Sequence, residues 1–211
     1  AVSSQGTRFF IQLIAGALSP KTITSISKAS PAVVTSTAHG LATGDIVALA
    51  GVVGMTEING LDAPVKVLTA NTFELTGIDS TAFTTYTSGG TATPYSFIES
   101  SQHKSYNFDD PGASDVDITT MVSDEKEYST GLPDPGNFTA DMHYVEDDAA
   151  QIEIETARGD GLSRWFKIKK RNGYFKCFYG SVKSFNDAGA IDGSNAGTLS
   201  VRVSGKKLSV K

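Results

Sequence analysis

Alternation of apolar and polar residues predicts two strands near the middle of the chain, over residues 113–119 and 138–144. Successive side chains of a strand point to opposite faces, so each strand should have one face toward a core and one toward water. The residues expected to back the sheet against the core are Val116, Ile118, Phe138, Met142 and Tyr144. Those expected on the wet face are Asp115, Asp117, Thr119, Thr139, Asp141 and His143.

Between these two strands lies an unusually long polar segment, MVSDEKEYSTGLPDPG. A hairpin normally closes with about two to five residues. A connection of this length is typically functional or disordered. The segment is therefore the first place to seek a function.

The remaining pattern predicts short strands and one helix. We expect a first strand within 6–18, four strands near 32–36, 46–50, 63–68 and 72–75, and C-terminal strands over 164–170, 174–179, 181–186 and 198–204. Asn172-Gly173 predicts a hairpin turn between two of them. Residues 147–161 fit a strand or a helix, because Ile152 and Ile154 alternate while helix start and stop signals flank them.

Composition supports a mainly β protein. The chain has 211 residues, of which 39% are apolar and 19% charged, and its 21 glycines suit frequent turns. The formal charge of −5 argues against a protein that grips nucleic acid, since such binding needs Lys and Arg to neutralise phosphates. The single cysteine, Cys177, is expected to be a buried structural thiol.

No pattern typical of catalysis or metal binding is present. The three histidines have no ligand-type neighbours at metal spacing, and there is no phosphate-binding glycine loop or serine nucleophile motif. We therefore expect no enzymatic activity, no cofactor and no metal. The apolar run FFIQLIAGAL is too short for a membrane span, and no targeting signal is expected. The basic run KIKKR at 167–171 is interpreted as a solvated or intersubunit strand face.

Several stretches together resemble the tail tube proteins of long-tailed bacteriophages. They are GTRFFIQ, DITTMVSDEKEYSTGLPDPGNFTADMHYVEDDAAQ, SRWFKIKKRNGYFKCFYGSVKSF and TLSVRVSGK. The resemblance implies a β-sandwich flanked by one helix, at about 149–157, and assembly into stacked hexameric rings around a channel for DNA. It implies a place in the virion tail, assembled in the host cytoplasm, with tape-measure and tail-terminator proteins as partners and no membrane.

The resemblance also gives roles to the two features described first. The wet-face residues would line the channel as a negative wall along which DNA slides without tight binding. The long loop would contact the neighbouring ring through Ser123, Asp124, Glu125, Lys126, Glu127, Tyr128, Leu132 and Pro133.

Residues 20–94 differ in texture, being rich in Thr, Ala, Ser, Val and Gly. Their pattern HGLATGD, GMTEING, NTFEL and YTSGG resembles a small β-barrel found in phage virion proteins and as the first catalytic-cysteine half-domain of ubiquitin-activating enzymes. The likeness implies a fold and no activity. We interpret 20–94 as a module inserted into a tube domain formed by 1–19 and 95–211, projecting outward and dispensable for the tube. Two tandem domains would leave the first strand with an unpaired edge.

Two other functions stay open. The inserted module could itself be the active part, binding host surface or glycan from the tail exterior, or the chain could form the tube of a contractile secretion apparatus. Particle size separates a tube subunit, which should form rings or filaments, from a binding module, which should stay monomeric. The tube of a contractile apparatus would share the fold but would be expected to lack the inserted module.

Overall fold

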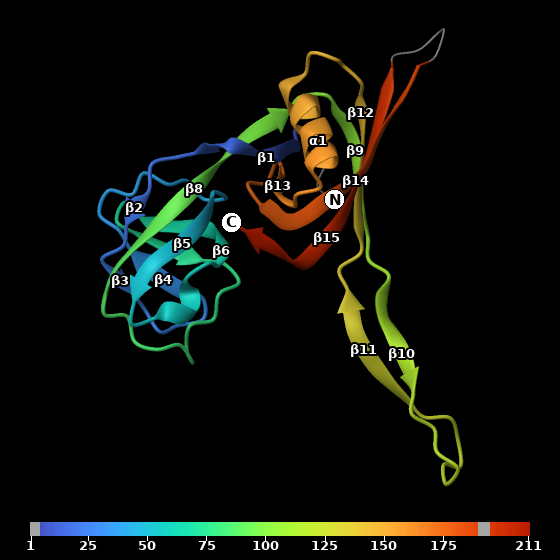
Figure 1. Cartoon of the computed structure of the whole chain (residues 1–211), viewed down its shortest axis with the longest axis horizontal. Coiled ribbons are helices and arrows are strands. Elements are labelled where there is room, and N and C mark those ends of the chain that lie inside the picture. Colours follow the sequence, from blue (N-terminus) through green and yellow to red (C-terminus); the bar gives the residue numbers. More distant parts are fainter. Residues whose placement is uncertain (1–4, 190–194) are drawn as a thin grey trace.

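The computed structural model describes residues 5–189 and 195–211. Strands make up 56% of the described residues and helix 8%, which confirms the prediction of a mainly β fold with one α-helix. Figure 1 shows three parts: a central sandwich with the helix, a compact module beside it, and a two-stranded arm that extends away from both.

The sandwich is built from strands near both ends and the middle of the chain. Its strands are β1 (Arg8–Ala17), β8 (Ser88–Ser100), β9 (His103–Asp109), β12 (Asn137–His143), β13 (Arg164–Lys169), β14 (Phe175–Ala188) and β15 (Ala196–Val210). They pair in the order β8-β1-β13-β14-β15-β12-β9, antiparallel throughout. Stacked Phe9, Phe138, Phe166 and Phe178 occupy the core. The predicted strands 174–179 and 181–186 are one continuous strand, β14, with irregular register against β15.

Helix α1 (Ala149–Asp160) covers this core, which confirms the helix expected at 149–157. The Asp148 side chain caps its N-terminus by accepting a hydrogen bond from the backbone N–H of Gln151 at 3.0 Å. Gly161 ends it in the left-handed conformation, with φ 67°. Ala150, Ile154 and Ala157 form the buried stripe.

The module comprises β2 (Lys21–Thr22), β3 (Ser25–Ile26), β4 (Ala32–Thr35), β5 (Ile46–Val53), β6 (Asp62–Thr69), β7 (Thr72–Leu75) and the short 3-10 helix η1 (Thr56–Ile58). Strands β4 to β7 confirm the four strands predicted there. Its core is separate from that of the sandwich and is centred on Val34, Leu49, Met55, Ile58 and Phe73.

A third hydrophobic cluster joins module and sandwich. Ile46 of the module packs with Trp165 and Cys177 of the sandwich, and Tyr95, Phe97 and Phe175 pack against them. Strand β8 runs through both parts, pairing with β5 over its first half and with β1 over its second.

Hydrogen bonds reinforce this junction at Asp62. The Trp165 Nε1–H donates to Asp62 Oδ2 at 2.9 Å, and the Tyr95 hydroxyl lies 3.1 Å from both carboxylate oxygens. Burial, with the Asp62 charge as second cause, raises the pKa of Tyr95 to about 12. That the module is dispensable stays a prediction, and the shared cluster at the junction argues against it.

Lys167 corrects the interpretation of the basic run as a solvated face. Its side chain is buried at the junction, with Nζ 4.2 Å from the Phe97 ring centroid and 3.7 Å from Asp45 Oδ1. Burial lowers the Lys167 pKa, and the Asp45 carboxylate opposes this. The alternation of Lys167 with Phe166 and Ile168 is real, but the module covers the face that looked solvated.

The arm consists of β10 (Gly112–Asp117) and β11 (Tyr128–Asp134), which, within the described part of the chain, pair only with each other and form a separate two-stranded sheet. This corrects the predicted pairing of 113–119 with 138–144. The second predicted strand, β12, lies instead between β9 and β15 in the sandwich. Half of the supposed long loop is thus the returning strand of a ribbon.

Candidate assembly surfaces

The arm, residues 112–134, has no hydrophobic core. No residue from 112 to 135 is buried, and a lone two-stranded ribbon is at best marginally stable in water. It nevertheless carries large apolar side chains in the open: Met121, Val122 and Leu132 are at least 90% exposed, and Tyr128 is 55% exposed. Apolar side chains concentrated on a projecting ribbon are typical of a surface that a partner covers.

Val116 and Ile118 belong to this exposed set, at 49% and 50%. Their predicted role as core backing is wrong for the single chain, because the alternation that placed them there belongs to the arm. Phe138 and Met142 are fully buried in the sandwich core and Tyr144 packs at its margin, as predicted for these three.

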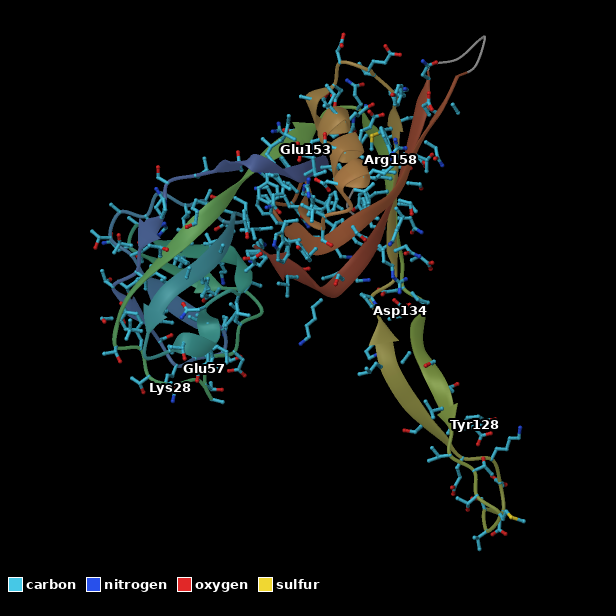
Figure 2. The ribbon with its side chains drawn as sticks, in the orientation of Figure 1. Lys28, Glu57, Tyr128, Asp134, Glu153 and Arg158 are labelled. Carbon is cyan, nitrogen blue, oxygen red and sulfur yellow. The ribbon has the colours of Figure 1, made fainter. Side chains whose placement is uncertain are left out.

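Ion pairs fix the base of the arm to β15. Arg202 Nη2 donates to both carboxylate oxygens of Asp134 at 2.8 Å, and Lys207 Nζ donates to Asp110 Oδ1 at 2.6 Å. The Asp134 pKa is lowered, first by the backbone N–H of Gly136 and then by Arg202. A Cβ at Gly136, where φ is 76°, would collide with the Asp109 carbonyl, so the chain turns tightly here. These contacts lie at the base of the arm, where Figure 2 labels Asp134.

The tip of the arm, residues 118–127, is organised by its own hydrogen bonds. Asp117 accepts from the Thr119 N–H at 2.9 Å, and the Thr119 hydroxyl accepts from the Glu127 N–H at 3.0 Å. Hydrogen bonding from Thr119 lowers the Asp117 pKa. The residues expected to contact a neighbouring ring, 123–128 with Leu132 and Pro133, all lie on the tip or on β11.

Charge is concentrated on the arm. Six of the 23 acidic residues and one of the 18 basic residues lie between positions 112 and 134, which gives this segment a formal charge of −5. That equals the charge of the whole chain, so the rest of the protein is neutral overall. The negative charge predicted for a channel wall lies mostly on this projection.

A second surface, the polar face, is the side of β9, β12 and β15 turned away from the core. Register places three rows of side chains on it: Ser105, Asn107 and Asp109; Asn137, Thr139, Asp141 and His143; Thr198, Ser200 and Arg202. Thr139, Asp141 and His143 therefore share one face, as predicted. Asp115, Asp117 and Thr119 lie on the arm, in or beside a different sheet, so the predicted set of six is not brought together.

Asp141 ties the polar face together. It accepts hydrogen bonds from Ser105 Oγ on β9 at 2.8 Å and from Thr198 Oγ1 on β15 at 3.2 Å. Most of the other side chains are hydroxyls and amides. The face is therefore polar and only weakly charged, in place of the strongly negative wall that was predicted.

One edge of this surface is open. Strand β9 pairs with β12 on one side, and among the described residues no strand pairs with its other side. Unpaired strand edges invite pairing with another chain. Sequence reasoning missed β9, although Tyr106 and Phe108 alternate with polar residues in HKSYNFD and give a strand signal.

Sequence reasoning also missed the arm anchors Arg202 and Lys207. Both are basic residues in strand β15, and their partners lie about 70 to 100 positions earlier in the chain. Nothing in the local pattern distinguishes them from solvated residues.

The described histidines are placed by structural hydrogen bonds. His39 is buried, its Nδ1 accepting from the Leu41 N–H at 3.0 Å, and His103 lies at the start of β9 between the carbonyls of Thr7 and Ser100. His103 is therefore part of strand β9. Across 5–189 and 195–211, no three His, Cys, Asp or Glu side chains are grouped as a metal site.

Cys177 is buried, as predicted, and burial raises its pKa to about 12, which makes it a poor nucleophile. None of the helices in the described ranges has the length and apolarity needed to cross a membrane.

Comparison with known families identifies one segment. A family model described as the ubiquitin-activating enzyme E1 FCCH domain matches residues 29–95, about a third of the chain. These residues cover most of the module. A search of curated proteins found no match. The module is therefore similar to that domain, in keeping with the resemblance noted from its sequence.

Proposed function

We propose that this chain is the tube subunit of a long bacteriophage tail, which polymerises into stacked rings around a DNA channel. The observation that carries the proposal is the arm, a polar ribbon with exposed apolar side chains and no core of its own. A ribbon of this kind is stabilised when another molecule covers its apolar side chains, as at an interaction site.

Two further features support ring formation. The open edge of β9 can pair with a strand of another subunit, and head-to-tail pairing of unlike surfaces closes into a ring when the rotation allows it. The polar face of β9, β12 and β15 then lines the channel. Its hydroxyls and amides, with Asp109 and Asp141, offer DNA few positive charges to bind.

Electron microscopy and sedimentation of the purified chain test the proposal. We expect rings or tubes from the unmodified protein. A variant with residues 118–127 replaced by Asn-Gly should remain folded and give single rings or free subunits, because the tip is lost while the sandwich is untouched.

An unmodified chain that stays monomeric at high concentration, and behaves like the variant without the tip, would overturn the proposal. It would favour the alternative in which the module binds a host surface or glycan.

A further inference from the structure

The acidic, apolar arm has a surface of complementary chemistry elsewhere on the same chain. Residues 164–186 and 195–211 contain eleven Lys and Arg and no acidic residue. Five exposed members of this set lie at the turn between β13 and β14 and along the end of β15: Lys169, Lys170, Arg171, Lys206 and Lys211. We call these five residues the basic end.

Positive charge accumulates around this region without full neutralisation. Burial lowers the pKa of neighbouring Lys176, and the charges of Lys207 and Lys170 lower it further. Lys207 has a partner in Asp110. The five residues of the basic end have no salt bridge to an acidic group among the described residues. Acidic groups from another molecule would find a favourable field here.

The basic end also borders a hollow of about 580 Å³ between sandwich and module. Its lining includes Tyr174, Lys206 and Lys211 from the sandwich and Pro31, Lys66 and Ile78 from the module. Glu74 and Asp79 line it too, and Glu74 pairs with Lys66 at 3.5 Å. The hollow thus combines apolar surface with lysines, as the arm tip combines Met121 and Val122 with acidic residues.

The arm does not reach this surface within one chain. It extends away from sandwich and module (Figure 1). The hydrogen bonds of its tip run between residues 117 and 127. We propose that the arm of one copy docks on the basic end of a second copy, with its tip in the hollow beside Tyr174. Because the two surfaces differ, each copy can both give and receive an arm, and the contact propagates along an assembly.

This inference rests on the proposed function and deepens it, by naming the surface that receives the arm and giving the module a part in forming it. Opposite charges across such a contact mainly speed association and fix its register. They are screened by salt, with a Debye length of about 10 Å at ~0.1 M.

Charge exchange between the two surfaces tests the inference. One variant carries Asp124→Lys and Glu125→Lys on the tip, and a second carries Lys170→Glu and Arg171→Glu on the basic end. Both pairs are exposed, and among the described residues none of the four side chains forms a hydrogen bond or a salt bridge. Assembly by each variant alone should be roughly tenfold weaker or more, because like charges then face each other. Combining all four changes in one chain should restore assembly. Mixing the two variants should restore it too, because alternating copies then bring opposite charges together at every contact.

A matched control reverses two lysines on the module, Lys21→Glu and Lys28→Glu, which neither line the hollow nor belong to the basic end, and it should leave assembly unchanged. Light scattering of the unmodified chain between about 0.05 and 0.5 M NaCl needs no variant, and should show assembly weakening as salt rises.

The outcomes separate the two proposals. If the unmodified chain never assembles, the proposed function fails and this inference fails with it. If it assembles but is insensitive to salt, or if the four-residue exchange does not restore what each pair abolished, the docking site is wrong while the tube assignment stands.

Discussion

The arm and the module both project from the sandwich, but they are attached in opposite ways. The module shares a core cluster with the sandwich, around Ile46, Trp165 and Cys177, and the continuous strand β8. The arm has no buried residue and is held at its base by the pairs Arg202–Asp134 and Lys207–Asp110. The module is thus part of the folded body, whereas the arm is available to another molecule.

This difference in attachment distinguishes a part needed for folding from a part available for assembly within one chain. Apolar burial is the main source of folding stability, so a part that shares a core cannot be removed without loss. A part joined by partly exposed ion pairs contributes little to stability, since such pairs give about 0–1 kcal/mol each. Removal of the arm should then affect assembly and leave the fold intact.

The largest expected effect is a difference in folding between two deletion variants, one without the module and one without the arm. Deleting residues 21–93 removes Ile46, Asp62 and the β5 pairing, which exposes Trp165 and Phe175, and the remaining chain should give no cooperative thermal transition by circular dichroism. Replacing residues 113–133 with Asn-Gly should leave a cooperative transition near that of the full chain. A well-folded product of the first deletion would restore the view of the module as a dispensable appendage.

The next effect concerns close packing at the junction. Gly44 has φ 92°, and a Cβ there would lie 2.6 Å from the Phe175 ring, whereas Gly60 has φ 83° with open space around it. Gly60→Ala should cost about 1–2 kcal/mol from backbone strain alone. Gly44→Ala should cost roughly 2–5 kcal/mol, because about 1–3 kcal/mol of overpacking is added. Denaturant unfolding measures both, and equal losses would show that the junction is loosely packed.

Local chemistry explains which elements the sequence predicted. Helix α1 was only partly predicted by local chemistry, because the start and stop signals around residues 147–161 fitted a helix or a strand and the family resemblance decided for a helix at 149–157. The β13–β14 hairpin followed from Asn172-Gly173, with Gly173 at φ 82°. The module strands were visible because Gly, Asn and Asp separate them.

The sequence did not reveal which parts of the chain pack against one another in the tertiary structure. Alternation at Val116 and Ile118 predicts a strand but does not say whether its apolar face meets a core or a partner chain. Strand β11 was concealed by Gly131 and Pro133, which look like turn residues yet lie in a ribbon free on both sides. Lys167 looked solvated because the face that buries it comes from another part of the chain.

The third effect compares the loss of stability on removing the Asp62 carboxylate, which accepts hydrogen bonds at the junction, with that on removing the Asp124 carboxylate on the arm. Asp62→Ala leaves the Trp165 Nε1–H and the Tyr95 hydroxyl without their acceptor, at a cost of about 1–3 kcal/mol in unfolding free energy. Asp124→Ala on the exposed tip should change stability by less than about 0.5 kcal/mol. Thermal or denaturant unfolding compares them, and similar values for both variants would contradict a structural role for Asp62.

The smallest effect concerns the arm base and its dependence on pH. The Asp134 pKa is lowered from 3.8 by the Gly136 N–H and Arg202, so the stabilisation it gives is present above 3.8 and is lost as pH falls through the lower folded value. In an NMR titration between about pH 6 and 2, the Gly136 amide resonance should shift with a midpoint below 3.8 as its acceptor is protonated. Asp134→Asn should remove that titration and leave the amides of β5 unchanged, because the module does not depend on this pair. A midpoint at or above 3.8 would mean that the ion pair does not hold the arm in solution, and that the arm takes its direction from the assembly it joins.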